Sequence, residues 1–198
     1  MVARAMTDPF VRFAAWYADA VKAIAVDPNA MVLSTVGPDG RPSARVVLLK
    51  GFDATGFVFY TNLESRKGRE LAARPAAALT FHFSPLGRQV RVEGVAHPVS
   101  AEEADSYFAT RPRGSQVGAW ASSQSAALPS RATLEARVAE VEARYRGQTI
   151  PRPPHWGGYR LVPDHIEFWV GRESRLHERD VFRRAGPDAP WTLQQLYP

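Results

Sequence analysis

Two arginines and a histidine stand close together in the segment SRLHERDVF, residues 174–182. Side chains of an extended strand alternate between two faces, so the spacing predicts that Arg175, His177 and Arg179 share one face. Cations this close repel one another unless an anion lies against them. The segment therefore predicts a surface that binds an anionic ligand.

A second basic pair lies in NLESRKGREL, where Ser65 is placed to cap a short helix. Arg66 and Lys67 then fall in the first turn, where cations oppose the helix dipole. A phosphate at this terminus would accept hydrogen bonds from free backbone N–H groups and from both side chains. A solvated basic turn explains the same residues, and the local sequence does not choose between these interpretations.

Hydroxyl and guanidinium groups come together again in SYFATRPRGS. Tyr107 and Arg111 are four residues apart and share a helix face, and Arg113 and Ser115 follow Pro112. These groups could hold a second phosphate. A tyrosine stacked on an arginine explains the pair equally well.

Three further candidates have simpler explanations beside the functional one. Gln124 and Ser125 in QVGAWASSQS offer polar contacts to a ligand, but they also suit an ordinary polar loop. Trp169 in IEFWVG is more typical of a core residue than of a platform for a bound ring.

Several common chemistries have no motif in this sequence. There is no P-loop, GxGxxG or HExxH pattern and no cysteine nucleophile. The five histidines show no paired spacing typical of metal ligands, so we expect no metal site. Classical hydrolase and nucleotide-fold functions are therefore not indicated.

The composition is that of a folded domain with a mild basic excess. The 198 residues are 45% hydrophobic and 23% charged, and the formal net charge is +5. A chain of this length buries roughly 70% of the surface that its unfolded form exposes. The charge favours nucleic acid, acidic lipid or a phosphorylated small molecule without separating them. Because no apolar run approaches the ~20 residues of a membrane span, we expect a soluble, cytoplasmic protein.

Periodicity and turn residues divide the chain into elements. We expect disorder in residues 1–7 and an amphipathic helix over residues 8–26. Further helices are predicted over 65–75, 100–112 and 130–147, and a small-residue loop over 113–130. A three-stranded meander is predicted over 30–36, 41–52 and 56–63. Later strands are predicted over 76–83, 88–99, 159–163, 165–171, 175–184 and 191–198.

The order of these elements predicts the fold class. Strands interrupted by helices, with no regular alternation, are typical of an α+β fold with an antiparallel sheet. We expect this sheet to curl into a barrel with peripheral helices, in a single domain over residues 1–198.

A series of longer segments resembles the pyridoxine/pyridoxamine 5'-phosphate oxidase family of FMN enzymes. The resemblance runs in register through MVLSTV, RVVLLKGFD, VFYTNLESRKGREL, RQVRVEG, YFATRPRGSQVGAWAS, HWGGYRL, IEFW and RLHER. It implies an antiparallel split β-barrel homodimer that binds FMN at the subunit interface, with no nucleic acid or membrane partner.

The resemblance also implies roles for individual residues. Those expected to bind FMN from one subunit are Arg45, Val46, Val47, Leu48, Leu49, Lys50, Tyr60, Thr61, Arg66, Lys67 and Gln89. Those expected to join them, some from the partner subunit, are Gln124, Ser125, Trp169 and Arg179. Those expected at the substrate phosphate are Lys50, Tyr107, Arg111 and Ser115. Arg175 and His177 are expected to face the pyridoxyl ring and its reacting carbon.

The function implied is an FMN-dependent oxidase in vitamin B6 metabolism. It would convert pyridoxamine 5'-phosphate or pyridoxine 5'-phosphate to pyridoxal 5'-phosphate with oxygen as acceptor. Two alternatives stay open: a related split-barrel flavin oxidase acting on another substrate, such as a phenazine precursor, and a flavin-binding module without turnover. A barrel that binds nucleic acid needs exposed aromatics among its cations, and strand-core packing explains FVFYTN better.

Two features depart from the family pattern, and one geometric detail does not fit a regular strand. Only MVARAMT precedes Asp8, where the family has an arginine-rich, tyrosine-containing segment that helps to cover the substrate. Gln195 stands where the family tends to have arginine, so a buried ion pair is expected to be missing or replaced. Arg45 and Lys50 are an odd number of residues apart, which in a regular strand gives them opposite faces, and a bulge or backbone contacts would reconcile this.

Overall fold

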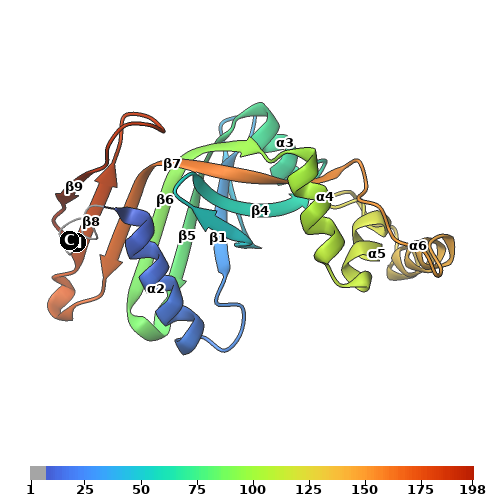
Figure 1. Cartoon of the computed structure of the whole chain (residues 1–198), viewed down its shortest axis with the longest axis horizontal. Coiled ribbons are helices and arrows are strands. Elements are labelled where there is room, and N and C mark those ends of the chain that lie inside the picture. Colours follow the sequence, from blue (N-terminus) through green and yellow to red (C-terminus); the bar gives the residue numbers. More distant parts are fainter. Residues whose placement is uncertain (1–7) are drawn as a thin grey trace.

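Polar side chains cap four α-helices, but not α5, in this computed structural model, which describes residues 8–198 (Figure 1). The Asp8 carboxylate accepts a hydrogen bond from the Phe10 N–H at 2.8 Å. Ser65, Ser100 and Ser130 cap three later helices in the same way. The helices are α2 (Pro9–Ala23), α3 (Arg66–Ala73), α4 (Ala101–Thr110), α5 (Arg113–Ala121) and α6 (Arg131–Arg144). The expectation of disorder in residues 1–7 lies outside the described residues.

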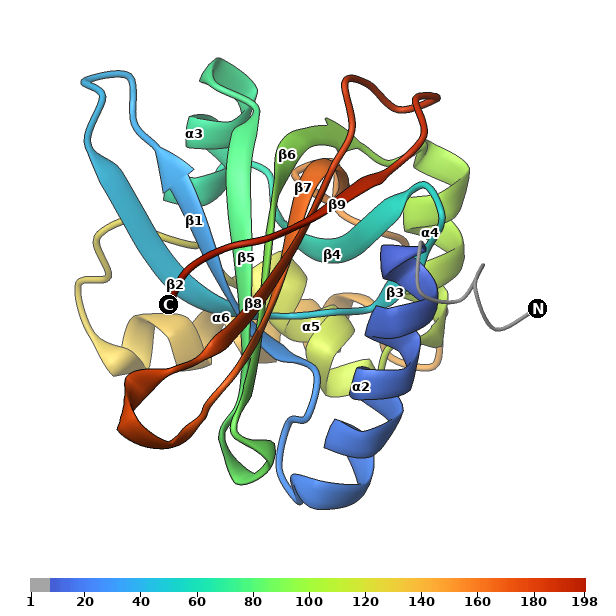
Figure 2. The same ribbon diagram turned by 90° about the vertical axis from the view of Figure 1, so that its left-hand side faces the viewer.

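The strands form one antiparallel sheet. They are β1 (Ala30–Val36), β2 (Pro42–Leu48), β3 (Gly51–Asp53), β4 (Gly56–Asn62), β5 (Ala76–Phe83), β6 (Arg88–Pro98), β7 (Trp156–Val170), β8 (Glu178–Arg183) and β9 (Thr192–Gln195). The order is β2-β1-β5-β6-β7-β4-β3, and β8 joins β7 and β9. Figure 2, seen from the β8 and β9 end, shows the strands fanned and curled with α2 beside them. The predicted α+β fold, with a curled antiparallel sheet and peripheral helices, is confirmed.

Strand β7 connects two halves of this sheet. Its first half pairs with β4, and its second half pairs with β8, while β6 runs along its other edge. The register between β6 and β7 shifts at Glu93 and Gly94. Gly94 is required there, because a Cβ at this position would lie 2.1 Å from the Val162 carbonyl oxygen. The shift bends the sheet where its two halves meet.

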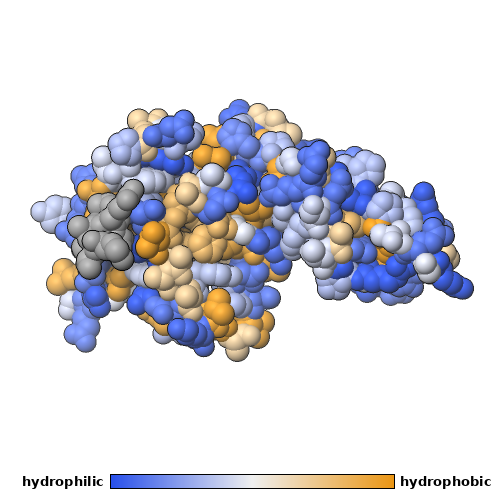
Figure 3. All heavy atoms as spheres, viewed as in Figure 1, coloured by the Kyte–Doolittle hydropathy of each residue, from blue (hydrophilic) through white to orange (hydrophobic). Residues whose placement is uncertain are grey.

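Two hydrophobic clusters support the fold. The larger packs α2 against the sheet through phenylalanines, among them Phe13, Phe57 and Phe81, all fully buried. The smaller joins α4, α5 and α6 around Phe108 and Trp156. Figure 3 shows apolar side chains gathered near α2 and the sheet, whereas the lobe of α5 and α6 is mainly hydrophilic on that face.

The predicted meander is wrong in its connectivity. Strand β4 does not follow β2 in the sheet, because it pairs with β3 and β7 instead. The segment 41–52 is also two strands rather than one, since β2 ends at Leu48 and β3 begins at Gly51. Between them Lys50 donates its backbone N–H to the Val58 carbonyl. This break, rather than a bulge, explains how Arg45 and Lys50 reach one cleft despite their odd spacing.

The loop predicted over residues 113–130 contains a helix. Helix α5 occupies Arg113–Ala121, although Gly114 and Gly118 disfavour a helix. Packing overrides this propensity, because Gln116 and Val117 are buried, and the Gln116 amide donates to the Phe108 carbonyl at 3.0 Å.

The C-terminal strands differ from their predicted bounds. The strands predicted over 159–163 and 165–171 are one continuous strand, β7, and β8 begins only at Glu178. Gln195 is not left unpaired, since its amide donates to Asp180 Oδ1 at 3.1 Å. Arg12 of α2 pairs with the other oxygen of Asp180 at 2.6 Å, so this carboxylate has both an amide and an arginine partner. Within residues 8–198, no helix has both the length and the apolar character needed to cross a bilayer.

Candidate active site

One cleft, with a volume of about 970 Å³, collects most of the predicted site residues. It lies where β2, β4, α3, α4 and α5 meet the loop over residues 122–125. The predicted residues that line it are Arg45, Val46, Val47, Leu48, Lys50, Tyr60, Thr61, Arg66, Lys67, Tyr107, Arg111, Ser115, Gln124 and Ser125. Its volume suits a large organic ligand.

Lys67 brings a buried ammonium group to this cleft. The residue is 9% exposed, and its Nζ donates to Thr61 Oγ1 at 3.1 Å and to Gln124 Oε1 at 3.0 Å. Burial and then the charge of Arg45 lower the pKa of Lys67 below its ordinary value. Because these hydrogen-bond partners are neutral oxygens, an anion in the cleft would compensate the charge.

Arg45 and Arg66 lie near Lys67. The Arg66 backbone N–H, at the start of α3, donates to Ser125 Oγ at 3.2 Å. Both arginines pair with the buried carboxylate of Glu70. We call Arg45, Arg66 and Lys67 the α3 cation cluster. Cations at a helix N-terminus form an arrangement suited to a phosphate.

A second cationic group in the cleft is centred on Arg111. Its guanidinium lies 4.8 Å from the centroid of the Trp156 ring, and its Nη1 atom is buried without a hydrogen-bond partner among the described residues, 8–198. Burial lowers the pKa of Arg111. Tyr107 and Ser115 line the same cleft. A buried donor without a partner is costly, so this group also fits an anionic ligand.

Tyr60 contributes an aromatic surface. Its ring stacks on Tyr107 at a centroid distance of 4.0 Å and an angle of 12°, and its hydroxyl donates to Glu103 Oε1 at 3.3 Å. Burial and the Glu103 carboxylate raise the pKa of Tyr60 to about 12. The phenol therefore stays neutral near pH 7. The alternative of Tyr107 stacked on Arg111 is not what the structure shows, since Arg111 lies over Trp156 instead.

Two residues singled out in the sequence lie outside the cleft lining. Leu49 is 4% exposed and belongs to the hydrophobic core. Arg113 donates to the backbone carbonyls of Tyr145 and Gln148, at 2.7 and 3.0 Å, and so ties α5 to the end of α6.

Gln89, Trp169 and Arg179 lie together but also outside the cleft. They form a row across three strands, because Gln89 pairs with Trp169 and Trp169 pairs with Arg179. The Arg179 guanidinium donates to both oxygens of buried Glu167, at 2.9 and 3.1 Å. Trp156, in the cleft lining, is at the other end of β7, up to about 40 Å away along the strand.

Arg175 and His177 precede strand β8, so the predicted shared strand face is wrong. Ser174 and Arg175 have φ values of 54° and 62°, which interrupts the extended chain. The Arg172 N–H donates to His177 Nδ1 at 3.1 Å, and the His177 ring lies 4.6 Å from that of Trp169. The turn nevertheless brings His177 to the row formed by Gln89, Trp169 and Arg179. We call this row, with Arg175 and His177, the C-terminal group.

Comparison with known proteins identifies the family. Residues 17–145 match the family described as pyridoxamine 5'-phosphate oxidase, and residues 156–198 match the pyridoxine 5'-phosphate oxidase C-terminal dimerisation region. The chain belongs to the pyridoxine/pyridoxamine 5'-phosphate oxidase family. A pyridoxine/pyridoxamine 5'-phosphate oxidase of Myxococcus xanthus (strain DK1622) is 65% identical over 191 residues, covering 96% of this chain and 92% of the relative. One of Burkholderia orbicola (strain MC0-3) is 59% identical over 197 residues, covering 99% and 92%.

Solved structures agree with membership of the pyridoxine/pyridoxamine 5'-phosphate oxidase family. PhzG from Burkholderia lata 383, in complex with tetrahydrophenazine-1-carboxylic acid, superposes with a TM-score of 0.90 at 36% identity, covering 97% of this chain and 93% of that protein. A pyridoxamine 5'-phosphate oxidase-related, FMN binding protein from Nostoc punctiforme PCC 73102 has a TM-score of 0.77 at 17% identity, covering 96% and 98%. The second likeness supports the fold alone.

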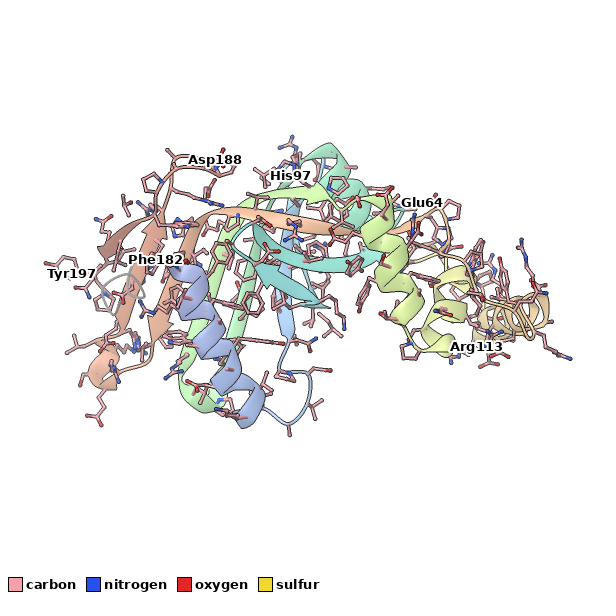
Figure 4. All side chains as sticks on the ribbon, in the orientation of Figure 1. Glu64, His97, Arg113, Phe182, Asp188 and Tyr197 are labelled. Atoms are coloured by element: carbon pink, nitrogen blue, oxygen red, sulfur yellow. The ribbon has the colours of Figure 1, made fainter. Side chains whose placement is uncertain are left out.

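The two regions of the oxidase family separate most residues of the two groups. Gln89 of the C-terminal group is an exception, because it lies in the first region, and Trp156 of the cleft lies in the dimerisation region. The α3 cation cluster and Arg111 lie in the first region, whereas Trp169, Arg175, His177 and Arg179 lie in the dimerisation region. The ribbon shows the corresponding elements, with Tyr197 at the β8 and β9 end and Arg113 on the opposite lobe (Figure 4). Within residues 8–198, a single chain therefore does not bring both groups into one cleft.

The residues of the cleft fit FMN, the cofactor of the oxidase family. FMN carries one phosphate and a flat ring, and the cleft offers the α3 cation cluster beside a helix N-terminus. The buried Lys67 ammonium, hydrogen bonded only to neutral oxygens, is the observation that favours a phosphate there. Arg111, whose buried Nη1 has no hydrogen-bond partner among residues 8–198, is a second cationic group in the same cleft.

Sequence reasoning missed several residues of this site. Asn62, Ser122 and Trp156 line the cleft, and Glu70 lies behind it. Trp156 stands within the family segment HWGGYRL, so a closer reading of that segment could have found it. The spacing of Glu70 four residues after Arg66 indicates a helical ion pair. Asn62 and Ser122 likewise stand within the family segments VFYTNLESRKGREL and YFATRPRGSQVGAWAS.

Proposed function

We propose that this protein is an FMN-dependent oxidase that converts pyridoxamine 5'-phosphate or pyridoxine 5'-phosphate to pyridoxal 5'-phosphate, with oxygen as acceptor. The observation that carries this proposal is the presence of two separate cationic groups in one cleft: the α3 cation cluster and Arg111. One suits the phosphate of the cofactor, and the other suits the phosphate of the substrate. The family and the relatives at 58–65% identity support the same reaction.

The residues proposed to bind FMN come from both the cleft and the C-terminal group. Arg45 to Lys50, Tyr60, Thr61, Gln124 and Ser125 surround FMN with the α3 cation cluster, and Gln89, Trp169 and Arg179 come from a second copy of the chain. Bound FMN supplies the acceptor for a hydride from the exocyclic carbon of the substrate and returns the electrons to oxygen. Leu49 can take part only through its backbone, because its side chain is in the core.

The substrate residues hold and orient the phosphorylated ring. Lys50, Tyr107, Arg111 and Ser115 bind its phosphate, and Arg175 and His177 of the second copy face the ring. The hydrogen bond from the Arg172 N–H requires a lone pair on His177 Nδ1, so the neutral ring carries its proton on Nε2. His177 is therefore a donor toward the substrate. Positioning of this kind can contribute several kcal/mol to catalysis.

The oxidase is a homodimer, as the dimerisation region of its family requires. We propose that residues 1–198 act as one FMN-binding split-barrel domain and that the enzyme is cytoplasmic. A chain without cysteine suits the reducing conditions of that compartment. Fractionation of cells that express the tagged chain tests its location.

A second candidate is an oxidase for a phenazine precursor, favoured by the likeness to PhzG. The ligand named in that structure carries a carboxylate and no phosphate. Arg111 with Tyr107 and Ser115 gives this chain a place for a phosphate that such a ligand would leave empty. The phosphorylated B6 substrate is therefore the better match.

The direct test is turnover under air. The purified protein, loaded with FMN, is mixed with pyridoxamine 5'-phosphate, and pyridoxal 5'-phosphate and hydrogen peroxide are measured together. We expect both products in equal amounts. Replacing Arg66 and Lys67 with alanine should weaken FMN binding by more than about a hundredfold, because each charge-assisted contact contributes roughly 1.5 to 3 kcal/mol. A flavin-loaded protein that forms neither product would contradict the proposal and leave a binding module or an oxidase for another substrate.

A further inference from the structure

Glu70 is a buried carboxylate at the base of the α3 cation cluster. Its side chain is 5% exposed and lies one turn after Arg66 in α3. Oε1 accepts a hydrogen bond from Arg66 Nε at 2.8 Å, and Oε2 accepts one from Arg45 Nη2 at 3.0 Å. Ser43 and Thr35 hydroxyls also donate to Oε2, at 2.7 and 2.5 Å. Four donors from three elements therefore converge on one carboxylate.

A negatively charged side chain is unexpected beside a site that binds an anion. Taken alone, its charge repels a phosphate bound by Arg45, Arg66 and Lys67 and offsets one of their three positive charges. Its pKa shows that the charge is retained: burial raises the pKa, but the hydrogen bonds from Thr35, Ser43, Arg66 and Arg45 lower it to about 2. Electrostatics by itself therefore predicts that removing Glu70 would tighten phosphate binding.

The geometry gives the opposite expectation. Arg66 contacts Glu70 through Nε, and its side chain is 62% exposed where it lines the cleft. Arg45 is held at both terminal nitrogens, by Leu33 O, Thr35 and Ser43 as well as by Glu70. Long basic side chains lose considerable conformational entropy when a ligand orders them. A carboxylate that orders them in advance removes that cost from binding.

We propose that Glu70 is a positioning residue, which holds the Arg45 and Arg66 guanidinium groups in the orientation that receives the FMN phosphate. This inference rests on the proposed function, because it assumes that the α3 cation cluster binds that phosphate. Glu70 touches neither cofactor nor substrate in this assignment and acts through the two arginines. The ordering of the two arginines by Glu70 strengthens FMN binding more than the repulsion between Glu70 and the phosphate weakens it.

The test compares affinities for FMN and for riboflavin, which lacks the phosphate, by flavin fluorescence on full-length dimer stripped of flavin. The variants are Glu70→Gln, which keeps the shape but removes the charge, and Glu70→Asp, which keeps the charge but shortens the reach. Glu64→Gln is the matched control, because exposed Glu64 lies in the same segment and its loss removes the same charge. Circular dichroism and a melting curve establish that each variant folds.

We expect Glu70→Gln and Glu70→Asp to weaken FMN binding by about tenfold or more, which is the loss of one charge-assisted contact, and to leave riboflavin binding unchanged. Glu64→Gln should bind both flavins as the parent does. Tighter FMN binding by Glu70→Gln would overturn the inference, because the carboxylate would then be only a repulsive charge. Equal losses for both flavins, or no change in either, would also overturn it.

The Arg66→Ala and Lys67→Ala double variant separates this inference from the proposed function. If it loses FMN affinity while Glu70→Gln does not, the cluster binds the phosphate and Glu70 does not position it. If neither variant discriminates FMN from riboflavin, the assignment of the phosphate to the cluster is itself wrong. Should Glu70→Gln fail to fold, the Glu70→Asp variant tests the inference instead. It keeps a buried negative charge beside the hydroxyl groups of Thr35 and Ser43.

Discussion

Trp156 and Trp169 lie at opposite ends of the same strand, β7, and belong to different halves of the proposed active site. Trp156 lines the cleft with Arg111 stacked on it, whereas Trp169 pairs with Gln89 and Arg179 across the sheet. A strand is stiff, so one chain cannot fold its two ends together. The proposed site therefore combines the cleft of one subunit with the C-terminal group of the other.

Mixed dimers test this division directly. One variant carries Arg66→Ala and Lys67→Ala in the cleft, and the other carries Arg175→Leu in the C-terminal group. Each homodimer should be impaired, but after unfolding and refolding together half of the dimers are mixed, and each mixed dimer holds one intact site. We expect activity to recover to about a quarter of the wild-type value. No recovery would place both groups in the same subunit's site.

Arg175→Leu should separate catalysis from cofactor binding. Arg175 lies in the turn before β8 and is assigned to the substrate ring, so the variant should remain dimeric and retain FMN. We expect kcat/KM for pyridoxamine 5'-phosphate to fall by about 1.5 to 3 kcal/mol of transition-state stabilisation. His177→Asn should act in the same direction. Unchanged efficiency in Arg175→Leu would refute its assignment.

Arg179→Leu is the contrasting change on the neighbouring strand. It should weaken FMN binding first, and excess FMN should partly restore the rate. It should also lower the melting temperature, because buried Glu167 loses the two hydrogen bonds from Arg179. Among the described residues, the ion pair that Glu167 keeps is with Arg91, at 3.4 Å. Flavin content and melting curves distinguish this variant from Arg175→Leu, for which we expect neither effect.

The stability of the protein in acid should depend on Glu70. Its folded pKa of about 2 lies below the ordinary value of 4.5, so its contribution is complete above pH 4.5 and is lost as the pH falls toward 2. The shift corresponds to at most about 3 kcal/mol. Urea unfolding should show Glu70→Gln less stable than wild type at pH 7, with the gap narrowing at pH 3. A gap independent of pH would contradict the depressed pKa.

Gly94→Ala should destabilise the join between the two halves of the sheet. A Cβ there would lie 2.1 Å from the Val162 carbonyl oxygen and 2.7 Å from the Pro163 Cα. Both are backbone atoms, so the sheet itself would have to shift to relieve the contact. We expect a loss of about 1 to 3 kcal/mol and a melting temperature lower by several degrees. Gly114→Ala is the control, because a Cβ at Gly114 has no neighbour within 4 Å. Its melting temperature should stay the same or rise slightly.

The sequence by itself determined the local elements and the chemistry of the cleft. Ser65, Ser100 and Ser130 mark helix starts through hydrogen bonds made within a few residues, so their signal is local. Arg66 with Lys67 raised the possibility of a phosphate site for the same reason, since the opposed helix dipole is a property of one turn, but a solvated basic turn stayed an equal alternative. The family resemblance supplied the cofactor and the reaction, which periodicity alone does not reach.

Tertiary structure decided what depends on contacts between distant residues. Helix α5 forms despite Gly114 and Gly118 because packing outweighs their propensity, and β4 pairs with β7 rather than β2 because strand neighbours are chosen across the whole chain. The shared face predicted for Arg175 and His177 failed because two positive φ values end the strand pattern. The separation of the cleft from the C-terminal group follows from the length of β7, and this separation makes the second subunit part of the proposed site.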